Sequence, residues 1–182
     1  RDVSPQALVE DALALQGRGN IGIAFTYNEP LVGYEYVRDT AILARQAGLE
    51  TVVVTNGQIE VEPLEELLPH ISAWNIDLKA FSQEGYRRLG GRLEVTLRTI
   101  EMTQAVSHVE VTTLVVPGLS DGEEDMKKEA AFLASLDPDI PLHLSRYFPC
   151  YQYDAAATPR QTLYRLRDLA SQSLNRVLLG NI

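Results

Sequence analysis

Cysteine is almost absent from this sequence, in which Cys150 is the only one among 182 residues. A single thiol cannot form an internal disulfide, and it cannot build a cluster of cysteine ligands. Because disulfides mark oxidising compartments, their exclusion favours a reducing, cytoplasmic location. We expect Cys150 itself to be a bystander in a loop.

Long apolar runs and an excess of basic residues are also missing. No run approaches the roughly 20 apolar residues that span a bilayer, and no signal peptide is visible. The formal net charge is −9. An acidic chain is a poor match for polyanions, so neither a membrane nor a nucleic acid is an expected partner.

Several common site motifs are absent as well. No Gly-x-Gly-x-x-Gly follows the first expected strand, which disfavours a dinucleotide-binding Rossmann fold. Neither a Walker loop nor a Gly-x-Ser-x-Gly nucleophile elbow is present. No Cys and His residues have the spacing of metal ligands, so no metal site is expected within this chain.

The remaining sequence alternates strand and helix patterns in a regular order. Strands are predicted at 21–26, 51–55, 73–78, 108–116, 141–146 and 175–179. Helices are predicted at 4–15, 31–47, 62–68, from 82 to the Gly90-Gly91 break, and at 93–105, 120–136 and 158–173. Such alternation requires a parallel sheet with helical crossovers. It predicts one α/β domain over residues 1–182, built either as a partial βα barrel or as an open doubly wound sheet.

Helix caps and chain ends complete this outline. Ser4 before Pro5 is an expected N-cap, as is Thr158 before Pro159. Capping boxes are expected at Ser120–Glu123 and Asp121–Glu124. The chain starts without Met and stops after an apolar strand, so we expect a fragment of a longer protein.

The segment Trp74–Lys79 carries the most information about function. Its apolar residues alternate with Asn75, Asp77 and Lys79, which therefore share one side of a strand. Polar groups there are costly unless they are paired or bind something. A carboxylate and an ammonium two residues apart can recognise a ligand that carries both charges; a structural ion pair is the alternative.

Polar residues also follow the other expected strands. In parallel α/β folds the carboxyl ends of the strands meet at the active site. Each group alone has a structural explanation, such as a turn at Asn56-Gly57 or a core histidine at His143. Together they predict one functional site, towards which Glu29, Asp77, Lys79, His143 and Arg146 converge.

These strand ends resemble those of radical S-adenosylmethionine (SAM) enzymes of the pyruvate formate-lyase activating enzyme branch. The similarity is greatest to the AmmeMemoRadiSam system radical SAM enzymes. It rests on runs that stand here as Thr26–Pro30, Asn75–Lys79, Glu110–Gly118 and His143–Pro149. The runs cover nearly the whole chain in the same order.

The resemblance implies a partial (β/α)₆ TIM-like barrel, without its first strand, that binds SAM across its strand ends. Glu29, with Asn28 beside it, would accept a hydrogen bond from the methionyl ammonium. Lys79 would lie near the methionyl carboxylate, with Asp77 orienting it or meeting the ribose. Thr55 and Asn56 would line the same pocket, Pro117 and Gly118 would lie near the adenine, and His143 and Arg146 would contact SAM or the substrate.

The resemblance also implies a [4Fe–4S] cluster, whose Cys-x-x-x-Cys-x-x-Cys ligands are missing here and are expected upstream of Arg1. The fragment alone would then be inactive, whereas the intact protein would cleave SAM to a 5′-deoxyadenosyl radical. Its substrate is undetermined; a partner protein is one class. A missing first strand would expose the edge of strand 21–26, so we expect either self-association or coverage of that edge by the N-terminal helix.

Two other function classes stay open at this point. One is a lyase or aldolase that forms a Schiff base on Lys79, which requires an uncharged amine. Asp77 counts against it because a nearby carboxylate favours the charged ammonium. The other is a non-enzymatic binding module that has no cluster.

Overall fold

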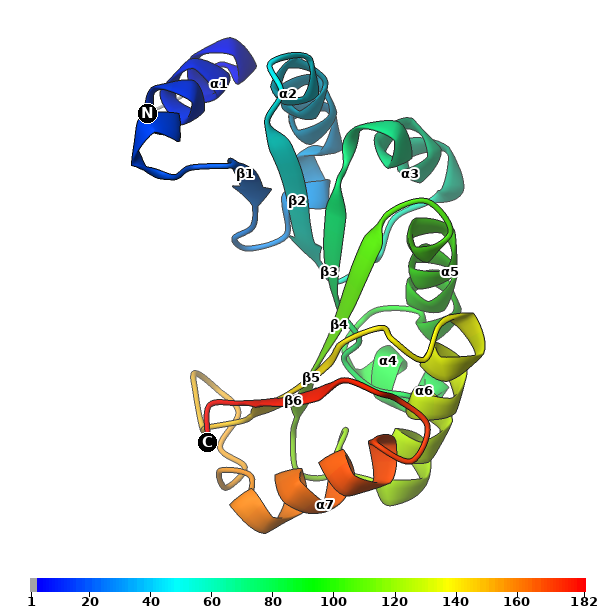
Figure 1. Cartoon of the computed structure of the whole chain (residues 1–182). Coiled ribbons are helices and arrows are strands. Elements are labelled where there is room, and N and C mark those ends of the chain that lie inside the picture. Colours follow the sequence, from blue (N-terminus) through cyan, green and yellow to red (C-terminus); the bar gives the residue numbers. More distant parts are fainter. Residues whose placement is uncertain (1–2) are drawn as a thin grey trace.

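The computed structural model describes residues 3–182, which form a single sheet of six parallel strands with helices between them (Figure 1). The strands are β1 (Gly22–Phe25), β2 (Glu50–Thr55), β3 (Ala73–Asp77), β4 (His108–Val115), β5 (Leu142–Arg146) and β6 (Val177–Gly180). The helices are α1 (Pro5–Ala14), α2 (Tyr34–Gln46), α3 (Val61–Leu67), α4 (Gln83–Arg88), α5 (Leu93–Gln104), α6 (Glu123–Leu136) and α7 (Arg160–Ala170). All six predicted strands are confirmed within a few residues at each end.

The order of the strands decides between the two predicted closures. The strands pair in chain order from β1 to β6, and every pairing is parallel. A doubly wound sheet reverses its order at a switch point, whereas a βα barrel does not. The sheet curves, and helices lie along its outer side (Figure 1). The partial TIM-like barrel is therefore confirmed.

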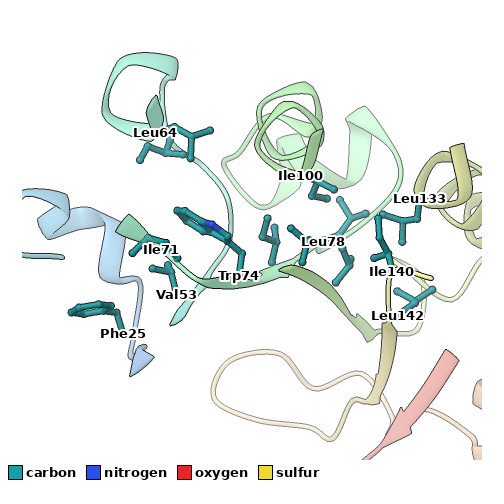
Figure 2. Close-up of a cluster of buried hydrophobic side chains, with 14 of the residues drawn as sticks. Phe25, Val53, Leu64, Ile71, Trp74, Leu78, Ile100, Leu133, Ile140 and Leu142 are labelled. Atoms are coloured by element: carbon teal, nitrogen blue, oxygen red, sulfur yellow. The ribbon is translucent and has the colours of Figure 1, made fainter. Parts of the chain in front are cut away.

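The core lies between the outer face of the sheet and these helices. Trp74, Ile76 and Leu78 are almost completely buried, while the residues between them are half-buried. Figure 2 shows Trp74 and Leu78 among apolar side chains from neighbouring strands and helices. Since side chains alternate along a strand, burying this set turns Asn75 and Asp77 to the inner face of the barrel.

Several helix ends were predicted correctly from the local sequence. The Ser4 hydroxyl accepts the amide N–H of Ala7, as predicted, and Gly48 follows α2 with φ +77°. The break at Gly90-Gly91 is also confirmed.

The predicted capping boxes before α6 are wrong. Ser120 Oγ donates to the Leu114 carbonyl at 2.6 Å and accepts the Val116 N–H at 2.8 Å, so it braces the end of β4. Asp121 accepts the Gly118 N–H, and the residue at the cap of α6 is Gly122.

The predicted cap at Thr158 is wrong for a similar reason. Its hydroxyl donates to the Val115 carbonyl at 2.5 Å, and α7 begins at Arg160 without a side-chain cap. Tertiary hydrogen bonds to β4 replaced the local ones in both cases.

Strand β1 forms one edge of the sheet. Within residues 3–182 its only strand partner is β2. This leaves the edge that the predicted self-association requires, and association itself stays a prediction.

Candidate functional site

A polar cavity of about 320 Å³ lies where β1, β2 and β3 end. This volume is within the range of small-molecule sites. Six of the ten predicted site residues line it: Asn28, Glu29, Thr55, Asn56, Asp77 and Lys79. Thr26, Tyr27 and Val54 complete its lining; they were not predicted, although Thr26 and Tyr27 stand in the same strand-end run.

The Glu29 carboxylate ties this side of the cavity together. Its Oε1 accepts the Thr55 hydroxyl at 2.6 Å and the Leu31 N–H at 3.1 Å. Its Oε2 accepts the Asn56 N–H at 2.7 Å. Since a carboxylate has about four acceptor positions, one of them stays available to a ligand.

The turn Thr55-Asn56-Gly57 holds these donors in place. Thr55 Oγ1 also accepts the Gly57 N–H at 3.1 Å, and Asn56 Oδ1 accepts the Gln58 N–H at 2.8 Å. Gly57 has φ +70°, and a Cβ there would lie 3.1 Å from Ile76 Cγ2 and 3.3 Å from Thr96 Cγ2. Only glycine fits this conformation without strain.

We therefore expect Gly57→Ala to destabilise the fold by about 1–2 kcal/mol, because it combines a left-handed backbone with tight contacts. Urea unfolding measures the change. Gly17→Ala is the matched control, because a Cβ at Gly17 would have nothing within 4 Å. Equal losses in the two variants would contradict this account of the turn.

The opposite side of the cavity carries an ion pair. Lys79 Nζ bonds Asp77 Oδ2, and the two side chains are 41% and 31% exposed, respectively. The pair is thus open to solvent and to a ligand. Behind it, Asn75 Oδ1 accepts the Thr112 hydroxyl at 2.9 Å. Glu29, Asp77 and Lys79 together leave a formal excess of one negative charge around the cavity.

Four predicted residues lie outside this cavity. Pro117 and Gly118 follow β4, where the Gly118 carbonyl accepts Arg88 Nη1 of α4 at 3.2 Å. Arg146 does not converge on Glu29 and Lys79 as expected. Its Nε donates to the Thr158 carbonyl at 2.7 Å, and its guanidinium lies 4.6 Å from the centre of the Phe148 ring. Arg146 stands two residues after the buried Leu144, so both side chains lie on the same, outer face of the sheet. There it is held by residues of the β5–α7 loop.

His143 lies on the inner face of the barrel, away from the cavity lining. Its Nε2 is 2.7 Å from Glu110 Oε2, and His108 Nε2 is 3.2 Å from Glu110 Oε1. Partial burial alone would raise the pKa of the Glu110 carboxyl, but these two histidines lower it overall. Glu110 and His108 were not among the predicted site residues. They stand two residues apart on β4 and so share one face of the sheet, which could have indicated this cluster.

Metal ligands do not gather anywhere in residues 3–182. No group of three His, Cys, Asp or Glu side chains there could hold a metal ion. Cys150 is exposed in the loop after β5, as predicted. The described residues therefore do not fit an iron–sulfur cluster.

Among residues 3–182, none of the helices combines the length and the apolar character that a membrane span requires.

Two known proteins are similar in sequence to this chain. The chain is 37% identical, over its full length, to the uncharacterized protein MJ0808 of Methanocaldococcus jannaschii, covering 54% of that protein. It is 27% identical over 74% of its length to the isethionate sulfite-lyase activating enzyme of Oleidesulfovibrio alaskensis, covering 45% of it. The chain thus spans about half the length of these relatives.

A solved structure shares the fold. A domain of a pyruvate-formate lyase-activating enzyme from Bacteroides vulgatus superposes with a TM-score of 0.75 at 22% identity, over 88% of this chain and 99% of that one. The family model of the radical SAM superfamily matches residues 1–130, which include every residue that lines the cavity. This chain belongs to the radical SAM superfamily.

Proposed function

We propose that the cavity at the ends of β1, β2 and β3 binds SAM. The observation that carries this proposal is that Glu29, after β1, and Lys79, after β3, line one polar cavity from the two strands that flank β2. SAM has a sulfonium and an ammonium against a single carboxylate, so it carries a net positive charge. The cavity has the complementary excess of one negative charge, and rigid strand ends hold Glu29 apart from the Asp77–Lys79 ion pair.

In this proposal each residue has a distinct role. Glu29 accepts the methionyl ammonium at its remaining acceptor position, and Lys79 donates to the methionyl carboxylate. Asp77 orients Lys79 or meets the ribose, while Asn28, Thr55 and Asn56 line the pocket. Further along the sheet, we propose Pro117 and Gly118 near the adenine, and His143 as a contact to SAM or to the substrate; Arg146 is left out of this set because it is held by Thr158 and Phe148.

For the whole protein we propose radical SAM chemistry, in which SAM yields a 5′-deoxyadenosyl radical. A [4Fe–4S] cluster needs three cysteine thiolates here, and the sequence contains one cysteine. The ligands would have to lie outside these 182 residues, and no electron-transfer step is assigned to the present ones. A cytoplasmic location is part of this proposal, because thiolates stay reduced there.

We further propose that the radical is delivered to a partner protein. Support comes from the name of the relative from Oleidesulfovibrio alaskensis, which activates a lyase. Within the superfamily we place the chain in the AmmeMemoRadiSam branch, on the motif runs Asn75–Lys79 and His143–Pro149.

The Schiff-base alternative is weakened by the ion pair. A Schiff base forms on a neutral amine, and Asp77 bonds the Lys79 ammonium directly. A binding module without a cluster would use the same cavity, so it differs from the proposal in activity rather than in SAM binding.

An NMR titration of the chain with SAM tests the proposal. We expect shifts at 26–30, 55–57 and 77–79, with a dissociation constant of about 0.1–1 mM or weaker, because few contacts are available without a cluster. Lys79→Ala should weaken binding by about three- to ten-fold, since the lysine is partly exposed and its charge is screened.

Lys127→Ala is the matched control, because Lys127 pairs with Glu124 on the exposed side of α6. It should leave the affinity unchanged. S-adenosylhomocysteine lacks the sulfonium charge and should bind more weakly than SAM. Absence of any shift at millimolar SAM, both in this chain and in a longer protein that includes cluster cysteines, would refute the proposal.

A further inference from the structure

The peptide group between Leu78 and Lys79 is held from two sides by buried side chains. The Lys79 N–H donates to Tyr86 Oη at 3.2 Å, and the Leu78 carbonyl accepts Thr113 Oγ1 at 3.1 Å. Tyr86 is 2% exposed and Thr113 is fully buried. Because β3 ends at Asp77, these two contacts fix the direction of the chain just beyond the strand.

A third buried group stands behind Thr113. Glu129, on α6 and 2% exposed, has its Oε1 2.5 Å from Thr113 Oγ1. The single hydroxyl proton of Thr113 cannot serve the Leu78 carbonyl and a carboxylate together. If Glu129 is the neutral acid, it donates to Thr113 and Thr113 donates to Leu78, so every group is satisfied.

The burial of Glu129 favours its neutral, protonated form. Removal from water raises the pKa of Glu129 to about 8, although the Thr113 hydroxyl opposes this rise. The nearby charged group on the same helix is Asp125, whose carboxylate raises the pKa further. Tyr86 on α4 is the other titratable neighbour, and burial raises its pKa too, so it stays neutral.

We propose that Tyr86, Thr113 and Glu129 are positioning residues for Lys79. They come from α4, β4 and α6, and they lock the backbone from which the Lys79 side chain extends to Asp77 and the cavity. A lysine loses much conformational freedom when it binds, and a fixed base reduces that cost. This inference rests on the proposed SAM site, whereas the locked peptide itself is independent of any ligand.

A double-mutant cycle between Thr113 and Lys79 tests the coupling. Thr113→Val keeps the shape of the side chain and removes the hydroxyl. We expect it to weaken SAM binding by about three- to ten-fold in the wild-type background and to have little further effect in Lys79→Ala, since residues in one network are not additive. Equal losses in both backgrounds, or no loss in either, would overturn the proposal.

Two comparisons separate positioning from general structural damage. Thr103→Val is the matched control, because Thr103 is also fully buried but donates to carbonyls within α5. It should leave SAM binding unchanged. Glu129→Gln retains a donor for Thr113 and should bind SAM like the wild type at pH 7, whereas Glu129→Ala should resemble Thr113→Val. A Gln variant as weak as the Ala variant would count against the donor role.

Amide hydrogen exchange gives a readout without ligand. Tyr86→Phe removes the acceptor of the Lys79 N–H, so exchange at Lys79 should accelerate about ten-fold or more, while Val111 in the middle of β4 stays protected. Unchanged exchange at Lys79 would refute the locked peptide. If exchange at Lys79 accelerates in Tyr86→Phe but the wild type does not bind SAM, the proposed function fails and the locked peptide stands.

Discussion

Replacing Glu29 with alanine is expected to abolish SAM binding and to destabilise the fold by about 2–4 kcal/mol. The Thr55 hydroxyl and the amides of Leu31 and Asn56 all donate to this carboxylate. Removing it leaves the three donors without their acceptor in a partly buried position. Hydrogen bonds to a charged group are also stronger than neutral ones, so the loss exceeds that of an ordinary surface substitution.

A Glu29→Gln variant separates the effect of charge from that of shape. Glutamine keeps one oxygen that can accept Thr55 and Leu31, but its amide nitrogen would face the Asn56 N–H. We expect about half of the destabilisation of the alanine variant, together with a complete loss of the ionic contact to the methionyl ammonium. Urea unfolding at constant m-value measures stability, and the SAM titration measures binding.

The control for this pair is Glu65→Ala, at an exposed position of α3. Its effect should stay within about 0.5 kcal/mol, as is usual for surface substitutions. If Glu29→Ala were no more destabilising than Glu65→Ala, the carboxylate would not be the connection between the end of β1 and the turn after β2.

The sequence predicted the sheet well because its signals are local and repeated. Trp74, Ile76 and Leu78 alternate with polar residues, and that alternation alone gives both the strand and the face that is buried. The partial barrel required more, because strand order is a property of the whole chain. Motif resemblance supplied it, and the observed order from β1 to β6 confirms it.

Helix starts were predicted less well, for a physical reason. Ser120 and Thr158 have the residue types of N-caps, but each hydroxyl donates to a carbonyl of β4. A hydroxyl has one proton to donate and can have several acceptors within reach. Which acceptor it binds is therefore not determined by its neighbours in sequence. The partners come from residues that fold close to it.

The same distinction divides the predicted site. Parallel pairing was enough to bring five predicted residues together, because they stand at or within four residues of the ends of neighbouring strands: Glu29, Thr55, Asn56, Asp77 and Lys79. Arg146 also stands at a strand end, but its side chain lies on the outer face of the sheet and donates to the Thr158 carbonyl. The support behind Lys79 could not be foreseen, because nothing local connects Tyr86, Thr113 and Glu129.

Glu129 provides the second large effect, a fall in stability as the pH rises. Its pKa is raised from 4.5 to about 8 by burial. Between these values the folded protein keeps a proton that the unfolded chain releases, so the free energy of unfolding falls by about 1.4 kcal/mol per pH unit from this group. Below pH 4.5 both states are protonated, and above pH 8 both are ionised, so the contribution is constant on either side.

Glu129→Gln removes this proton linkage and keeps the side-chain shape. The difference in unfolding free energy between variant and wild type should therefore shift in favour of the variant by about 3 kcal/mol between pH 5.5 and pH 8. Urea unfolding at a series of pH values measures it, and other titrating groups cancel in the difference.

Glu124→Gln is the matched control on the same helix, because the Lys127 partner lowers the pKa of the exposed Glu124 carboxyl. That control should change the slope little above pH 5.5. A Glu129→Gln curve parallel to the wild type over this range would show that Glu129 is already ionised in the folded protein, and Thr113 would then donate to it rather than to the Leu78 carbonyl.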